Sequence, residues 1–138
     1  MKLFLDTNVI LDLYLPERDK NGVRMVMSVG DRPFCRNCVS ALSIANMAYI
    51  LRKILGKEAT ERAVKEITDN CRITEIPDTC VYDAIGSECP DFEDAMQISS
   101  AELNGCDVIV TNNKKHFTGY TFLPVYTPKE FLEHLRHS

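Results

Sequence analysis

The chain has 138 residues, of which 45% are apolar and 26% are charged, and its formal net charge is −4. A chain of this length can bury a proper core, so we expect residues 1–138 to form a single soluble domain. The acidic balance argues against a broad electrostatic grip on nucleic acid, which usually needs a basic face. The apolar stretch at the amino terminus is too short for a membrane span or a signal peptide, so we expect a cytoplasmic protein.

Short apolar runs alternate along the chain with segments whose apolar residues recur at helical spacing. The first half is predicted to contain a strand at residues 2–6, helices at 9–15 and 17–29, a strand at 33–40, and helices at 41–55 and 58–70. The second half is predicted to contain a strand at 72–76, helices at 79–85 and 91–104, strands at 107–111 and 123–126, and a helix at 128–136. This alternation implies a mostly parallel sheet with helices on both faces, a three-layer α/β/α sandwich.

Three groups of polar residues lie where a predicted strand ends or a late helix begins. They are Asp6-Thr7-Asn8, Asp91-Phe92-Glu93-Asp94 and Thr111-Asn112-Asn113. Ligands of open α/β sheets bind at the carboxyl ends of the strands. We therefore expect the three groups to share one site.

Both acidic groups also have a structural interpretation. Asp6 can cap the helix that follows it, because a side-chain oxygen at this position accepts a free backbone N–H. Asp91 can cap the next helix, with Asp94 as its third residue in a variant of the capping box. Asp91 and Asp94 are three residues apart and share a helix face. One of them can cap the helix while the other binds an ion.

Converging carboxylates suggest a metal site. Carboxylates from separate elements repel one another unless a cation lies between them. Ligand sets made of oxygen favour Mg²⁺ or Mn²⁺ over zinc, and such an ion can activate water and stabilise both reacting oxygens in phosphodiester cleavage. Asp6 is the first predicted ligand; in the late group Asp94 ranks first, Asp91 second and Glu93 third.

Other reactive residues offer weaker chemistry. Cys35 and Cys38 form the only C-x-x-C pair, which lacks the second half of a zinc site, and the six cysteines are expected to stay unpaired in a reducing compartment. His116 lies near the presumed site but has no serine or cysteine partner, so we do not predict it as a general base. A phosphate-transfer enzyme with Asp6 as nucleophile would need a second acid two residues on, where the chain has Asn8.

Three stretches, in this order and spacing, carry a resemblance to a known family. They are LDTNVILD at residues 5–12, DFEDAMQ at 91–97 and VIVTNNKKHF at 108–117. Together with the predicted elements, they are similar to the PIN domain family along nearly the whole chain.

The resemblance implies an endoribonuclease that depends on Mg²⁺ or Mn²⁺, most often the toxin of a prokaryotic toxin–antitoxin pair of the kind called VapC. It also implies an RNA substrate, a homodimer, and a small antitoxin that inserts into the active site. For RNA we look first at the window between Asp31 and Glu58, which contains no acid but several basic residues: Arg32, Arg36, Arg52, Lys53 and Lys57. Tyr49 and Ile50 in this window fit a core better than a dimer interface.

The family's functional positions can be carried over to this chain. The first acid of the family corresponds to Asp6 and the third to Asp94. Thr7, Asn8 and Thr111 match the polar positions that support the site.

The chain departs from the family pattern at two of the four acids. The usual glutamate on the helix after the second strand corresponds to Asn46, and the usual aspartate after the fourth strand corresponds to Asn113. The amides keep oxygen donors but remove charge, and Asp91 and Glu93 can restore part of that charge.

Two functions therefore remain open. In the first, a metal-dependent endoribonuclease, Asp6 and Asp94 hold the ion while Asp91, Asn46 and Asn113 orient water or complete the shell. The second is a catalytically inactive PIN-like module that binds RNA or a protein through the same groove.

Overall fold

A computed structural model describes residues 1–137 and contains one five-stranded sheet in the order β3-β2-β1-β4-β5. All four neighbouring pairs in this sheet are parallel. The strands are β1 (Lys2–Leu5), β2 (Arg36–Ser40), β3 (Arg72–Thr74), β4 (Val108–Val110) and β5 (Val125–Tyr126). The predicted α/β class is confirmed, and the sheet is parallel throughout rather than mostly so.

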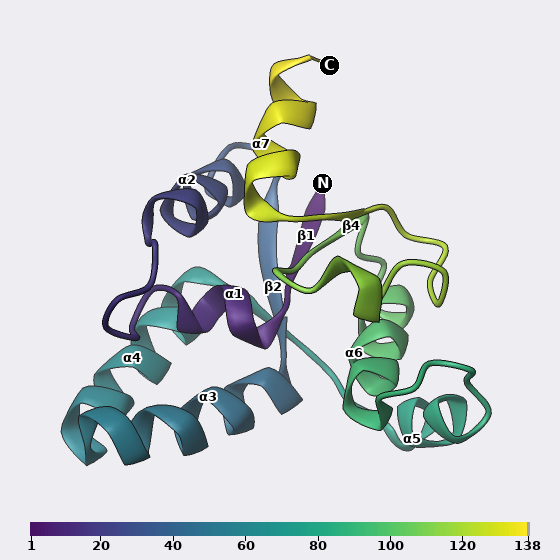
Figure 1. The fold of residues 1–138 in the computed structure, drawn as a ribbon, viewed down its shortest axis with the longest axis horizontal. Coiled ribbons are helices and arrows are strands. Elements are labelled where there is room, and N and C mark those ends of the chain that lie inside the picture. Colours follow the sequence, from purple (N-terminus) through teal and green to yellow (C-terminus); the bar gives the residue numbers. More distant parts are fainter. Residues whose placement is uncertain (138) are drawn as a thin grey trace.

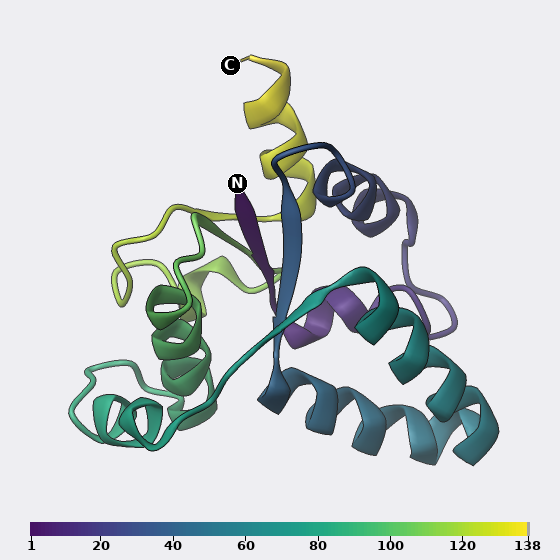
Figure 2. The same ribbon diagram turned by 180° about the vertical axis from the view of Figure 1, so that it is seen from behind.

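Helices cover both faces of the sheet (Figures 1 and 2). One layer contains α1 (Thr7–Leu11), α2 (Asn21–Gly30), α3 (Ala41–Leu55), α4 (Lys57–Asn70) and α7 (Pro128–Arg136). The other layer contains α5 (Asp78–Ile85) and α6 (Phe92–Leu103). A single turn of 3₁₀ helix, η1 (Lys114–His116), follows β4. Within residues 1–137, none of the helices has the length and apolar character needed to cross a bilayer.

The central strand β1 is buried on both sides, as its unbroken apolar run predicts. Leu3 and Leu5 point into the core beneath α1 to α4, whereas Phe4 points into the core beneath α5 and α6. All three side chains have no exposed surface. The strand is therefore clamped between two cores, and the residue that follows it is held at a fixed place on the sheet edge.

The largest differences from the predicted boundaries have local reasons. The first helix begins at Thr7 rather than at residue 9, because Asp6 caps it, and it gives way to a turn after Leu11. The second helix begins at Asn21 rather than at residue 17, because Glu17 adopts a left-handed backbone with φ of 66°. The strand expected from residue 33 begins at Arg36, because Phe34 is left-handed and lies in an exposed turn.

Tyr49 was expected in the core, but its side chain is 65% exposed on α3. Lys53, one helical turn further on, donates a hydrogen bond to the Tyr49 hydroxyl and places its ammonium 4.1 Å from the ring centroid. Ile50 is partly buried and packs against the larger core, as expected.

Close packing leaves no space for a side chain at Gly30, the last residue of α2. A Cβ added to Gly30 would lie 2.1 Å from the side-chain amide of Asn37, whose Nδ2 donates to the carbonyl of Met27 at 3.0 Å. Asn37 is 1% exposed, so its amide has no free space to move into.

We expect Gly30→Ala to lower the free energy of unfolding by about 1–3 kcal/mol, the usual cost of overpacking a filled site. Gly86→Ala is the matched control, since it lies at the end of α5 with its nearest neighbour atom 3.8 Å from an added Cβ; there we expect a change of about 0.5 kcal/mol or less. Urea unfolding of the two variants measures both. A Gly30→Ala protein as stable as the control would contradict this packing.

Candidate functional site

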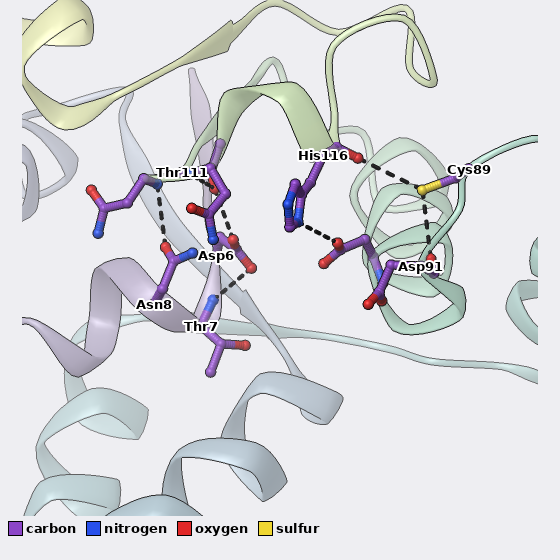
Figure 3. A network of polar contacts seen from close by, with 10 residues as sticks. Asp6, Thr7, Asn8, Cys89, Asp91, Thr111 and His116 are labelled. Atoms are coloured by element: carbon purple, nitrogen blue, oxygen red, sulfur yellow. Dashed lines mark hydrogen bonds and ion pairs between the residues drawn. The ribbon is translucent and has the colours of Figure 1, made fainter.

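Asp6 follows β1 directly and is 6% exposed, although it carries an ionisable side chain. Its Oδ1 accepts the backbone N–H of Thr7 at 2.8 Å, so it caps α1, and its Oδ2 accepts the hydroxyl of Thr111 at 2.8 Å. The Asp6 backbone N–H donates to the carbonyl of Val110 at 3.0 Å and extends the pairing of β1 with β4. The Asp6 carboxylate thus caps α1 and also lies buried at the carboxyl end of the central strand (Figure 3).

The late acidic group lies at the first turn of α6, where its three members have different surroundings. Asp91 caps the helix, since its Oδ1 accepts the N–H of Asp94 at 2.8 Å. Glu93 is hydrogen-bonded to the side-chain amide of Asn46 on α3. The Asp94 carboxylate lies 3.2 Å from Nδ1 of His116 on η1, and Figure 3 shows the His116 ring turned toward the start of α6.

The acids of this site repel one another electrostatically. Burial, with a smaller contribution from the charge of Asp94, raises the pKa of Asp6 to about 6, although the bonds from Thr111 and Thr7 oppose the shift. Burial and the charge of Asp91 raise the pKa of Asp94, while His116 lowers it. Burial, Asp91 and Asp6 raise the pKa of Glu93. Asp6, Glu93 and Asp94 are therefore close enough to disfavour one another's charge, which is the situation a bound cation relieves.

A buried polar network that the sequence did not reveal joins the two halves of the site. Gln97 on α6 is 1% exposed and accepts a hydrogen bond from the Ser40 hydroxyl at the end of β2. Its Nε2 lies 2.7 Å from the Ser43 hydroxyl and 3.3 Å from the Thr7 hydroxyl. Since Gln97 is one helical turn after Asp94, this network fixes the register of α6 against the strand ends.

The polar residues after β4 hold the loop that faces α1. The Asn8 side chain accepts the backbone N–H of Asn112 at 3.2 Å, and the Asn112 amide donates to Asp12 at 2.8 Å. Asn113 is exposed, and its backbone N–H donates to the Thr111 hydroxyl at 3.0 Å. Asn8 and Thr111 thus lie where the sequence predicts supporting residues, and Asn113 lies at the rim.

The basic residues of the window between residues 31 and 58 lie on different elements of the fold. Arg36 begins β2 and pairs with Lys2, so it lies at the amino edge of the sheet, opposite Asp6. Arg52 is in the last turn of α3 and lines a pocket together with Lys57 of α4. RNA binding by the residues of this window stays a prediction. Lys115, on η1 next to His116, lines a pocket together with Asp91 and Asp94.

The donor set fits a hard divalent cation. Within residues 1–137, no three carboxylate, imidazole or thiol side chains converge closely enough to enclose an ion. Mg²⁺ does not require such a cage, because it is usually held by one or two carboxylates and keeps several waters. Asp6 and Asp94 meet that need, with Glu93 close by.

Comparisons with known proteins show one family over most of the chain. A family model described as PIN domain matches residues 2–115. Ribonuclease VapC1 of Aquifex aeolicus (strain VF5) is 30% identical over 141 residues, which cover 96% of this chain and 94% of that protein.

Two solved structures share the fold at lower identity. VapBC-1 from nontypeable Haemophilus influenzae has a TM-score of 0.72 at 20% identity, covering 94% of this chain and 99% of that chain. A toxin–antitoxin complex from Klebsiella pneumoniae has a TM-score of 0.69 at 19% identity, covering 91% of this chain and 97% of that chain.

The raised pKa of Asp6 predicts how stability depends on pH in the metal-free protein. Folding raises this pKa from 3.8 to about 6, so the folded chain binds the proton more tightly and loses stability as the pH rises between these values. We expect Asp6→Asn, which is uncharged at every pH, to raise the free energy of unfolding by up to about 3 kcal/mol near pH 7.5 and by about 1 kcal/mol near pH 4.5.

Urea unfolding in EDTA at the two pH values measures this difference. Asp31→Asn, at an exposed position after α2, is the control and should change stability by less than about 0.5 kcal/mol. An Asp6→Asn protein that is less stable than wild type near pH 7.5 would show that the hydrogen bonds of the carboxylate outweigh its desolvation.

Proposed function

The chain belongs to the PIN domain family, and from this premise we propose that it is a metal-dependent endoribonuclease that acts as the toxin of a toxin–antitoxin pair. The observation that carries the proposal is the buried carboxylate of Asp6, facing the acids of α6 at the carboxyl edge of the sheet. The similarity to a protein named Ribonuclease VapC1 over nearly the whole of both chains supports RNA as the substrate. We further propose that residues 1–138 act as a single PIN domain.

We propose Mg²⁺ or Mn²⁺ as the ion, held by Asp6 and Asp94. When bound there, such an ion supplies an activated water and stabilises the leaving oxygen of a phosphodiester. The hydroxyl of Thr111 and the N–H of Thr7 hold the Asp6 carboxylate in one orientation. Asp91 orients Asp94 through the first turn of α6 rather than binding the ion itself.

In this proposal Glu93 takes the place of the family's glutamate on α3. The family places a glutamate on α3, where this chain has Asn46, and Glu93 from α6 is hydrogen-bonded to that amide. Glu93 therefore supplies, from a different helix, a carboxylate close to the position of the missing one. Asn113 at the rim contributes an amide oxygen in place of the family's other acid.

A small antitoxin and a second copy of the chain are the proposed partners. The Klebsiella pneumoniae structure with the same fold is described as a toxin–antitoxin complex, which supports the first. The homodimer rests on the family resemblance. Because its proposed substrate is cellular RNA, we propose that the protein acts in the cytoplasm.

A catalytically inactive module that binds RNA or a protein is the second candidate. The amides at Asn46 and Asn113 favour it, since they remove two negative charges from the family's site. Asp6 and Asp94 favour the nuclease, because a binding module has no need for a buried carboxylate that repels its neighbour.

Cleavage of total cellular RNA by the purified chain separates the two. With Mn²⁺ we expect discrete fragments, and we expect EDTA, Asp6→Asn or Asp94→Asn each to slow their formation by about 100-fold or more, the effect of losing one electrostatic group of a site. Asp31→Asn serves as the matched control and should cleave like wild type. Equal fragment yields from wild type and Asp6→Asn would leave the binding module as the better account.

A further inference from the structure

A small cavity opens beside the acids, at the junction of α6 and η1. It has a volume of about 260 Å³ and is lined by Pro90, Asp91, Asp94, Lys115 and His116. Pockets that enclose drug-sized ligands have volumes of about 300–1,000 Å³. This cavity is therefore suited to one part of a larger ligand.

Hydrogen bonds hold the two walls of the cavity in place. The thiol of Cys89, which is 8% exposed, donates toward the carbonyl of Asp91 at 3.5 Å and toward the carbonyl of His116 at 3.6 Å. The His116 ring is oriented by its contact with Asp94. Figure 3 shows these contacts running from Cys89 to both walls. These contacts restrict the positions of both walls, and a restricted site reduces the entropy cost of binding.

The walls differ in chemistry. Pro90 and His116 carry rings, whereas Asp91 and Asp94 carry carboxylates. The carboxylates would repel a phosphate but can accept hydrogen bonds from the exocyclic amine of a base. Imidazole rings are among the side chains on which unpaired RNA bases stack.

Lys115 supplies a positive charge at the rim. Lys114 beside it forms an ion pair with Glu130 at 3.1 Å, whereas within residues 1–137 nothing pairs with the ammonium of Lys115. A polynucleotide that inserts a base into the cavity would carry its adjoining phosphate past this rim. The charge is therefore placed for a backbone phosphate.

We infer that this cavity is a nucleotide subsite, which accepts one unpaired base of single-stranded RNA next to the reacting phosphate, with His116 as its stacking platform and Lys115 as its phosphate contact. The inference rests on the proposed function for the identity of the strand. It adds a specificity-determining position that the acids alone do not provide.

Two variants of His116 separate stacking from its contact with Asp94. His116→Phe keeps a ring but cannot hydrogen-bond to Asp94, whereas His116→Asn keeps a side-chain N–H but has no ring. We measure the fluorescence anisotropy of a short fluorescein-labelled single-stranded RNA, with Asp6→Asn present in every protein so that cleavage does not interfere. His116→Ala and His116→Asn should weaken binding about 5- to 100-fold, the range for losing one stacked base, and His116→Phe should bind within about threefold of the parent.

Lys115→Ala should weaken binding and reduce its dependence on salt by about one phosphate contact. Lys65→Ala is its control, because Lys65 is exposed on α4 and paired with Asp69.

RNAs with an abasic site at each position in turn test the subsite without altering its fold. One position should lose affinity in the parent protein and show no further loss in His116→Ala. Equal binding by all His116 variants, or a loss in His116→Phe with retention in His116→Asn, would overturn the subsite.

The results expected if the nuclease proposal fails differ from those expected if the subsite inference fails. If the wild-type protein does not cleave RNA but its RNA affinity still depends on the ring at position 116, the subsite stands and the nuclease falls. If it cleaves RNA but no His116 variant changes affinity, the nuclease stands and the subsite falls. A protein that binds no RNA at all contradicts both.

Discussion

Burial of one carboxylate, that of Asp6, is the constraint on which the rest of the site depends. An acid between two cores is costly because its charge is removed from water, and the structure offsets this cost with two short hydrogen bonds from Thr111 and Thr7. The charge of Asp94 raises the pKa of Asp6 further, because the two carboxylates repel each other. A cation would stabilise this arrangement, so under the proposed function the burial that weakens the metal-free fold would also favour metal binding, an exchange of stability for function seen in many sites.

The second requirement is that α6 places its acidic residues next to Asp6. This helix lies on the opposite face of the sheet from α1 and α3, so its position relative to Asp6 could vary if apolar packing alone held it. Gln97 removes that freedom, because its buried amide bonds to hydroxyls at the end of β2, the start of α3 and the start of α1. A directional network of this kind specifies one register, whereas apolar contacts tolerate small shifts.

The sequence predicted the layers of the fold because strand and helix periodicities are strong in it, and it missed boundaries where single residues such as Glu17 and Phe34 adopt left-handed backbones. It placed Asp6 and Asp94 correctly at element ends, since caps and ligands share the same positions. The sequence did not predict the hydrogen bond between Glu93 and Asn46, because a contact between helices on opposite faces of the sheet leaves no pattern within either segment.

The central claim is that the carboxylate absent from α3 is supplied by Glu93 on α6. Calorimetric titration of Mn²⁺ into wild type, Glu93→Gln, and Glu93→Gln combined with Asn46→Glu tests it most directly. The account predicts that Glu93→Gln weakens Mn²⁺ binding by about tenfold, and that adding Asn46→Glu restores most of the affinity, since it returns a carboxylate to α3 beside residue 93. Equal affinity of wild type and Glu93→Gln, or no recovery in the double variant, would contradict it.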